Sequence, residues 1–392
     1  MSTLRPTSGN ELADIVASAA AEGRRLALRG GGSKSAIGAP DARATVVEMT
    51  GFAGVIDYDP AELVLTLGAG TPLAEVQALV AGENQMLAFD PFDHGPIFRA
   101  SAGASTIGGV VAAGIAGSRR VSAGGARDHL LGFAGVSGRG ERFVAGARVV
   151  KNVTGYDLPK LVCGSWGRLV AMTELTLRVL PRPREAVTQV FHGFSPGEAL
   201  TILTAAMRSQ ASVAAAAHLP GHLRGGQAIT ALRLEGFGPS IRARMAMLDD
   251  LLGGIGKGEL MSGAEANALW SDLHTLAPLD DERPLWRISL PANGCSTLIA
   301  ALRPAGARYL IDWAGGLIWL TCDGAAERVR RTASSVGGHA MLVRADAATR
   351  AVTPAFHPQP RALAALEARV RRAFDPAGIF ETGRFGDMAC AD

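Results

Sequence analysis

The segment Gly146–Val179, GARVVKNVTGYDLPKLVCGSWGRLVAMTELTLRV, decides how the rest of the chain is interpreted. Its pattern predicts a strand, a polar glycine turn, the start of a helix and a second strand. Two shorter glycine-rich segments precede it, at Leu28–Gly38 (LRGGGSKSAIG) and Ala104–Ala113 (ASTIGGVVAA). Because glycine lets a backbone approach a ligand closely, we expect the three segments to form walls of one site.

The first glycine-rich segment has the composition of a phosphate-binding loop. Gly30–Ser35 follows a strand predicted at Arg24–Gly30 and can point several backbone N–H groups into one concavity, while Lys34 adds a positive charge. It is not a P-loop, because Ser33 precedes the lysine, and not a Rossmann fingerprint, because Ser35 occupies the third glycine position. From these residues alone, a flexible turn is the alternative.

A second strand is predicted to enter a helix through a tight glycine turn. The strand is Glu62–Gly68, Thr71 is the expected N-cap, and Pro72 is the expected first helical residue. Leu87–Arg99 contains two prolines and shows no steady hydrophobic period. We therefore interpret it as a loop that crosses a site.

The second glycine-rich wall begins at Gly103 and continues in small residues to Gly117. Small side chains would let a planar or anionic ligand approach the backbone, and Ser105 and Thr106 offer hydroxyl groups. A tightly packed helix of small residues is the alternative interpretation.

Composition limits the class of protein. The chain has 392 residues, of which 48% are hydrophobic and 19% charged, as in soluble globular proteins. This length favours two domains. The net charge of +3 gives no chain-wide basic field, so we expect no nucleic-acid partner.

Targeting and cysteine patterns point to a cytosolic protein. The first residues, MSTLRPTSGNELADIV, lack a basic segment followed by an apolar run, and no apolar stretch would span a bilayer. The four cysteines are far apart and form no CxxC pair, so we expect no metal site or iron–sulfur cluster held by this chain alone. Membrane association would then be indirect, peripheral at the inner membrane through a complex.

Several motifs together resemble a known family. RGGGSK, TLGAGT, ASTIGG, RDHLLG and KNVTGYDLPKLVCGSWGRL, with the C-terminal FDPAGIFETGRF, are similar to FAD-linked oxidases of the vanillyl-alcohol-oxidase type. More narrowly, they resemble the FAD-binding subunits of bacterial glycolate oxidases. The resemblance is specific over residues 25–183 and looser in the middle of the chain, where LWRISLP at Leu285–Pro291 is the main match.

The resemblance implies an α+β fold with three parts. Residues 1–183 would form a PCMH-type FAD-binding domain of two subdomains, residues 184–356 a smaller α+β cap domain, and residues 357–392 a helix and tail returning to the FAD domain. The cluster Pro181–Arg184 would stop a strand at the first boundary.

It also implies a set of cofactor-binding residues. The loop would hold the FAD pyrophosphate, the second wall would line the pyrophosphate and ribityl chain, and the third would border the flavin. These residues are Gly30, Gly31, Gly32, Ser33 and Lys34; Ser105, Thr106, Gly108 and Gly109; and Lys151, Asn152, Gly155 and Asp157. Arg127 and Asp128 are either neighbours of the pyrophosphate or an internal ion pair, and the Tyr156 ring either packs or faces the flavin.

One departure from the superfamily concerns how FAD is held. Several members attach FAD through a histidine in the phosphate loop, and GGGSKS contains none. We therefore expect non-covalent FAD.

The cap region lacks an evident acid–base cluster, so no catalytic residue is predicted. His218 and His222 have a metal-ligand spacing, but Pro220 and Gly221 between them interrupt a helical face. Arg287 alternates with apolar neighbours and could point into a cleft.

Three hypotheses remain open. The first is a flavoprotein subunit that oxidises glycolate to glyoxylate together with a second, catalytic FAD-containing subunit and an iron–sulfur subunit. The second is a self-sufficient FAD-dependent D-2-hydroxyacid dehydrogenase, and the third is a non-catalytic scaffold with a degenerate flavin fold. The first is favoured, because a full set of FAD motifs accompanies a cap without acid–base chemistry.

Overall fold

The computed structural model describes residues 3–40, 43–146, 155–223, 225–386 and 390–391. The chain divides into two compact units. Unit 1 comprises residues 1–116, 124–182 and 358–392, and unit 2 comprises residues 117–123 and 183–357. The short segment Gly117–Ala123 therefore belongs to unit 2, although the sequence led us to expect it in the FAD domain.

Unit 1 contains two main sheets and six helices among its described residues. Its strands are β1 (Thr3–Leu4), β2 (Leu26–Arg29), β3 (Thr45–Glu48), β4 (Val55–Asp59), β5 (Val64–Gly68), β6 (Gln85–Met86), β7 (Leu130–Ser137), β8 (Arg142–Gly146), β9 (Val170–Arg178), β10 (Leu180–Pro181), β19 (Gln359–Pro360) and β20 (Cys390–Ala391). Its helices are α1 (Gly9–Glu22), α2 (Leu73–Gly82), α3 (Ile107–Ala113), α5 (Ala126–His129), α6 (Leu158–Val162) and α13 (Arg361–Phe374).

The first sheet of unit 1 is parallel, in the order β1-β3-β2, and the second is antiparallel, in the order β4-β5-β9-β7-β8. Ser8 caps α1 by accepting a hydrogen bond from the Glu11 amide, as its sequence predicts. Leu12 and Val16 on this helix pack with Leu26 of β2 in a common core.

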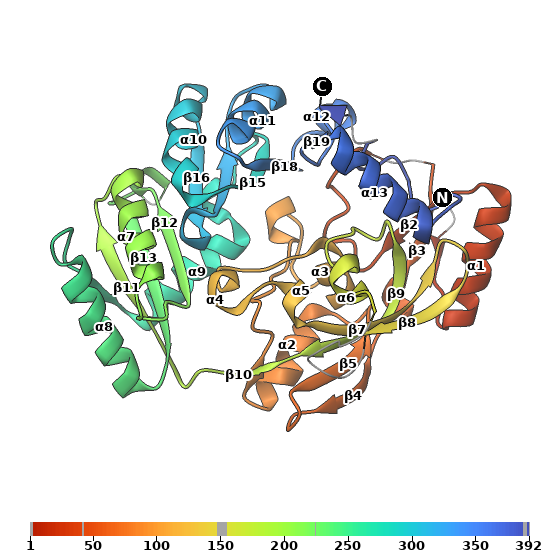
Figure 1. Ribbon diagram of the computed structural model, residues 1–392, viewed down its shortest axis with the longest axis horizontal. Helices are drawn as coiled ribbons and strands as arrows, with labels where there is room; N and C mark the ends of the chain where they lie inside the picture. The colour runs from red at the N-terminus through yellow and green to blue at the C-terminus, as the bar shows by residue number, and fades with distance from the viewer. Residues whose placement is uncertain (1–2, 41–42, 147–154, 224, 387–389, 392) are drawn as a thin grey trace. The chain divides into compact units, whose positions relative to one another are not determined.

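The C-terminal segment is part of unit 1. Figure 1 shows α13 (blue) among elements from the start of the chain (red). Beyond it, Ile379 and Phe380 enter the core of the first sheet, and the Asp375 carboxylate accepts hydrogen bonds from both of their amides. Buried backbone groups with such partners hold the tail in place.

Unit 2 is built on one antiparallel sheet of eight strands, in the order β14-β11-β13-β12-β16-β17-β15-β18. These are β11 (Glu185–His192), β12 (Ala215–Leu219), β13 (Ile229–Gly236), β14 (Glu259–Met261), β15 (Leu285–Ser289), β16 (Arg308–Asp312), β17 (Leu317–Thr321) and β18 (His339–Arg344). The helices are α4 (Arg120–Ala123), α7 (Pro196–Arg208), α8 (Gly238–Leu252), α9 (Gly263–Thr275), α10 (Cys295–Leu302), α11 (Ala326–Ser335) and α12 (Ala347–Val352).

The α+β class is confirmed in both units, but one helix start is displaced. Thr71 was expected to cap α2, yet the N-cap is Pro72 and the helix begins at Leu73. The Thr71 hydroxyl instead donates to the Gly68 carbonyl at 2.7 Å. This hydrogen bond within the preceding turn competes with capping of the helix.

Candidate functional site

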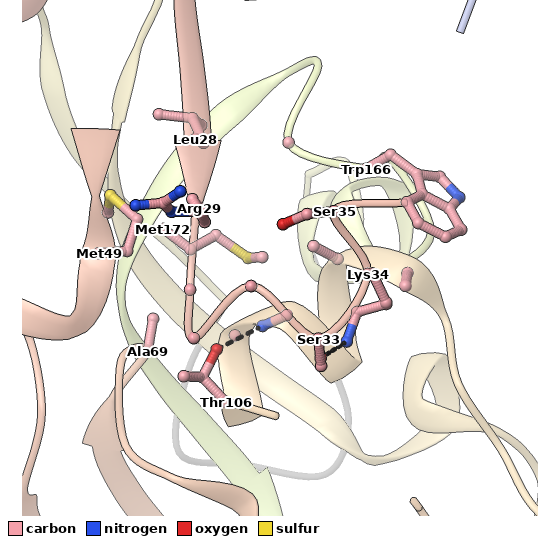
Figure 2. Close-up of a pocket in the computed structure, with 18 of the residues that line it drawn as sticks. Leu28, Arg29, Ser33, Lys34, Ser35, Met49, Ala69, Thr106, Trp166 and Met172 are labelled. Atoms are coloured by element: carbon pink, nitrogen blue, oxygen red, sulfur yellow. Dashed lines mark hydrogen bonds between the residues drawn. The ribbon is translucent and has the colours of Figure 1, made fainter. Parts of the chain in front are cut away.

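The loop between β2 and Ile37 lies at the centre of a pocket in unit 1 (Figure 2). The residues that line it come from β2 and the loop after it, from the residue after β3, from the turn after β5, from α3 and its N-cap, from β9 and the turn before it, and from the tail. They are Leu28, Arg29, Gly30, Gly31, Gly32, Ser33, Lys34, Ser35, Met49, Ala69, Thr106, Gly108, Gly109, Ala112, Ala113, Trp166, Gly167, Val170, Met172 and Arg384. Nine of the expected cofactor residues precede α3 or lie in it, and eight of them line this pocket.

Close backbone packing explains why glycine occupies the loop. A Cβ atom on Gly31 would lie 1.9 Å from the Ala104 carbonyl oxygen, and one on Gly30 would lie 2.2 Å from Thr106 Oγ1. A Cβ on Gly108 would lie 2.6 Å from the Ala69 carbonyl oxygen. The first two glycine-rich segments thus approach each other so closely that no side chain fits between them, which leaves a wall made of backbone.

Lys34 is a half-buried cation at this wall. Its ammonium group donates a hydrogen bond to Ser33 Oγ at 3.1 Å, and it forms no ion pair with a carboxylate of the described residues. Burial lowers the pKa of Lys34 to about 8; the negative charge of Asp93 opposes this change, and Arg384 adds to it. A buried ammonium with unused N–H donors favours an anion beside it.

A hydrogen-bonded chain connects Lys34 to Asp93 through two hydroxyl groups. The Ser105 hydroxyl lies 2.7 Å from Asp93 Oδ1 and 2.9 Å from Ser33 Oγ. Since a hydroxyl has one proton, Ser105 donates to the carboxylate and Ser33 donates to Ser105. Asp93 also accepts from the amides of Gly95 and Gly103, at 2.8 and 2.5 Å. Burial would raise the pKa of Asp93, but these bonds outweigh it and lower the pKa.

The C-terminal tail supplies one charged wall of the pocket. Arg384 Nε donates to the Ile37 carbonyl at 2.7 Å, and Nη2 donates to the Lys34 carbonyl. The Arg384 carbonyl accepts from the Ala39 amide at 2.7 Å. The tail therefore fixes the end of the glycine loop.

Two methionines and an arginine line the part of the pocket away from Lys34. Met49, Met172 and the Arg29 side chain lie together there, while the Trp166 ring lies on the side of Ser35 and Lys34 (Figure 2). Trp166 has a left-handed backbone conformation, φ 57°, and its amide donates to the Ala112 carbonyl at 2.8 Å. An unfavourable backbone conformation held by the surrounding structure marks a position worth functional attention.

The remaining expected cofactor residues lie elsewhere or outside the described residues. Ser105 does not line the pocket, but it is hydrogen-bonded to Ser33, which does. Gly155 and Asp157, like Arg127 and Asp128, are not among the pocket-lining residues. Lys151 and Asn152 lie outside the described residues.

Local hydrogen bonds occupy the two displaced carboxylates. Asp128 Oδ2 accepts from the Gly125 amide at 2.8 Å at the start of α5. Asp157 caps α6 and accepts from Lys160 Nζ at 2.6 Å, a bond that lowers the pKa of Asp157. The Tyr156 side chain is 92% exposed, so the expectation of a packed ring is wrong.

Sequence reasoning missed Asp93, Trp166 and Arg384 at the site. Asp93 lies in the proline-broken segment that we interpreted as a loop crossing a site, so its neighbourhood was indicated but its role was not. Arg384 belongs to the C-terminal motif FETGRF, expected only to return to the FAD domain. Trp166 lies in the third glycine-rich segment, at GSWGR, but no role was predicted for its side chain.

His218 of the cap is a buried residue with a hydrogen-bond partner and, in the part of the chain that the structure describes, not part of a metal site. His218 is fully buried, and its Nδ1 lies 3.0 Å from Thr230 Oγ1. Within the described residues, no three histidine, cysteine, aspartate or glutamate side chains converge as a metal site would require. No helix in the described part of the chain is long and apolar enough to cross a bilayer.

Comparisons with known proteins agree with this geometry. The family described as "FAD binding domain" matches residues 2–146. Glycolate oxidase subunit GlcE of Escherichia coli is 32% identical over 92% of both chains. A D-lactate dehydrogenase of Archaeoglobus fulgidus is 28% identical over 46% of this chain and 39% of its own length.

Among solved structures, an alkyldihydroxyacetonephosphate synthase matches 96% of this chain and 75% of its own, with a TM-score of 0.70. At 17% identity, this likeness shows the fold alone. The match to the Escherichia coli protein covers almost the full length of both sequences. The chain therefore belongs to the family of glycolate oxidase subunit GlcE.

Proposed function

We propose that this chain holds FAD non-covalently as a subunit of a complex that oxidises glycolate or a similar 2-hydroxy acid. A second, catalytic flavin subunit and an iron–sulfur subunit would complete the complex. The observation that carries the proposal is the pocket of unit 1, where a glycine wall, a half-buried lysine and two methionine side chains lie together. The Escherichia coli relative is named as a subunit of glycolate oxidase, which supports a place for this chain in a complex.

The residues of the pocket fit both parts of FAD. The backbone wall at Gly30–Gly32 and the unused donors of Lys34 suit the two phosphates, because buried anions need donors in place of water. The part of the pocket beside Met49 and Met172, where the Arg29 guanidinium also lies, suits one of the planar ring systems. No histidine lines the described wall, which supports non-covalent binding.

When bound, FAD supplies the two-electron acceptor that oxidation of a 2-hydroxy acid requires. The chain's own residues have other tasks. Lys34 balances phosphate charge, and the chain through Ser33 and Ser105 to Asp93 fixes its ammonium group. Met49 and Met172 would shield a ring bound beside them from water, which protects a reduced cofactor from side reactions.

Purification of the chain alone tests the proposal. The expected result is a yellow protein that releases FAD on heat or acid denaturation, which would show non-covalent binding. A colourless protein that takes up no added FAD would contradict it. Flavin that stays with the polypeptide after denaturation would contradict non-covalent binding alone.

Activity measurements separate the alternatives. Turnover of glycolate or D-lactate by the isolated chain with an artificial electron acceptor would indicate a self-sufficient dehydrogenase. Unchanged flavin content and complex activity in the Lys34→Ala and Asn152→Ala variants would indicate a scaffold. Co-purification with partner subunits, followed by counting flavins in the complex, tests the proposed assembly directly.

A further inference from the structure

Two arginines of unit 2 lie against one tryptophan without carboxylate partners. The guanidinium carbons of Arg120 and Arg287 lie 4.6 and 5.0 Å from the centroid of the Trp313 ring. Neither arginine forms an ion pair with a carboxylate of the described residues. We call Arg120 and Arg287 the arginine pair.

The sheet places Arg287 on a face distinct from the main core of unit 2. Its neighbours in β15, Trp286 and Ile288, belong to that core, so Arg287 points the other way. Trp319 of β17 is the cross-strand partner of Arg287, and the guanidinium carbon lies 6.0 Å from its ring. Within the described part of the chain, the Arg287 guanidinium donates one hydrogen bond, from Nη1 to Ser289 Oγ at 3.4 Å.

The segment Gly117–Ala123 brings Arg120 to the same place. Ser118 Oγ donates to Asp312 Oδ2 at 2.8 Å, and Trp313 Nε1 donates to the Gly117 carbonyl at 3.0 Å. Next to Arg120, Arg119 forms an ion pair of 2.9 Å with the nearly buried Glu235. Contacts on both sides thus hold Arg120 beside Trp313.

The nearby carboxylate of Asp312 does not neutralise the pair by hydrogen bonding. Asp312 is 3% exposed, and its oxygens accept from Ser118 and from the Trp313 amide. Trp313 and Ala314 both have positive φ, 51° and 54°. Such strain at adjacent residues without glycine is uncommon and is found where the structure requires a fixed side-chain position.

Electrostatics supports the same interpretation. Burial and, to a smaller extent, the neighbouring charge of Arg120 lower the pKa of Arg287 to about 10, against the attraction of Asp312. Two like charges held together on an apolar surface destabilise the empty site. An anion bound between them would remove that cost.

We propose that the arginine pair binds the carboxylate of a small organic acid in unit 2. Guanidinium groups match a carboxylate with two parallel hydrogen bonds, and the indoles of Trp313 and Trp319 suit a short carbon chain better than an inorganic ion. The choice of a 2-hydroxy acid as ligand rests on the proposed function, whereas the site rests on the residues of unit 2 alone.

The test is calorimetric titration of the full chain, loaded with FAD, with glycolate. The wild type should bind glycolate, while glycolamide, its neutral analogue, and inorganic phosphate should bind at least about tenfold more weakly. The variants Arg287→Met and Arg120→Met should each weaken glycolate binding by about tenfold or more. Arg331→Met, at an arginine of α11 whose side chain is 73% exposed, is the control and should bind as the wild type does.

Thermal melting distinguishes a ligand site from a structural contact. If the arginine pair exists for a ligand, Arg287→Met should melt at the wild-type temperature or above it. If Arg287 mainly supports the fold, the variant should melt at a lower temperature than the wild type. Its loss of glycolate affinity should then be explained by its loss of folded protein. Arg287→Lys keeps the charge but not the planar fork, so it should fold and still bind glycolate more weakly.

The outcomes also separate this site from the proposed function. A flavin-free chain that binds glycolate through the arginine pair would contradict the proposed function and leave the site standing. A flavin-loaded chain that does not bind glycolate, or binds it equally in all variants, would overturn the site. Equal affinity for phosphate and glycolate would show a general anion site and overturn the assignment to an organic acid.

Discussion

Each unit contains a half-buried cation without an ion-pair partner among the described residues, but the surroundings of the two differ. Lys34 in unit 1 lies among backbone groups and hydroxyls, and a chain of hydrogen bonds connects it to Asp93. Arg287 in unit 2 lies against two indole rings and has a second arginine nearby. Burial lowers the pKa of both side chains.

This difference separates a site for a resident group from a site for an exchanging one. Around Lys34, a rigid glycine wall would hold an anion with many donors, as a tightly bound cofactor requires. Around Arg287, two guanidinium groups and two indole rings would make few contacts with a ligand, so the ligand can dissociate. Local environment, and not the presence of a half-buried charge, indicates which kind of ligand each unit takes.

The largest effect is expected when the support of the arginine pair is removed. Glu235, whose side chain is 8% exposed, binds Arg119 and Arg233 at 2.9 and 2.8 Å. Glu235→Gln would leave two arginines without their carboxylate and lower the free energy of unfolding of unit 2 by about 4 kcal/mol. Chemical denaturation followed by tryptophan fluorescence measures this change.

A surface substitution provides the control for that experiment. Glu327 is 82% exposed and pairs with Arg331 one helical turn away at 3.4 Å. Glu327→Gln should change the free energy of unfolding by less than about 0.5 kcal/mol. Equal effects of the two substitutions would show that the segment Gly117–Ala123 is not held by its buried ion pair.

The wall around Lys34 should be intolerant of a single methyl group. In Gly31→Ala, the new Cβ would lie 1.9 Å from the Ala104 carbonyl, which forces the first two glycine-rich segments apart. We expect a loss of about 3 kcal/mol in FAD binding, or about 100-fold in Kd. Fluorescence titration of the apo-protein with FAD measures it, and Gly82→Ala, where nothing lies within 4 Å of the new Cβ, is the control. Normal FAD affinity in Gly31→Ala would mean that the wall does not contact FAD.

Acid should destabilise unit 2 through a buried histidine. Burial lowers the pKa of His218 from 6.5 to about 4, so the unfolded chain binds its proton more tightly. The contribution of neutral His218 is present above pH 6.5 and is lost as the pH falls toward 4, by about 3 kcal/mol in total. Unfolding midpoints at several pH values should show this loss in the wild type and in His192→Asn, but a smaller one in His218→Asn. The same slope in all three proteins would exclude His218 as its source.

The sequence predicted regular elements wherever periodicity and turn residues agreed. Two strand-like runs on either side of Ala314-Gly315-Gly316 predict a hairpin, which is confirmed as β16 and β17, and apolar residues at helical spacing predict a helix over Arg361–Phe374, the bounds of α13. The apolar stripe of that helix was not a core, since Leu363 and Leu366 are each 47% exposed. Periodicity shows that a helix has an apolar face, but it cannot show that a partner covers it.

The candidate site was partly predictable for a physical reason. The glycines of the first two walls could be identified, because close backbone approach requires glycine wherever it occurs. Asp93 and Arg384 could not, because their roles depend on contacts with residues far away in the chain. The segment Gly117–Ala123 was missed for the same reason, since only tertiary structure assigns it to unit 2.

The smallest effect we predict concerns the charge of Lys34 itself. Lys34→Met should weaken FAD binding at pH 7 by about 2 kcal/mol, or about 30-fold, because one charged donor is lost and the backbone wall remains. In the wild type, bound phosphates would raise the pKa of Lys34 above its value of about 8 in the empty pocket, so binding takes up a proton above that pH.

The affinity of the wild type for FAD should therefore be constant below pH 8 and fall by at most about tenfold for each pH unit above it. Lys34→Met should show no such fall, while Lys257→Met, at an exposed lysine of unit 2, should behave as the wild type does. Fluorescence titrations with FAD from pH 6 to about 10 measure all three proteins, within the usual range of lysine titration. If FAD affinity still falls above pH 8 in Lys34→Met, another group of the pocket takes up the proton. The proposed difference between a cofactor site in unit 1 and an exchanging-ligand site in unit 2 would then rest on the glycine wall alone.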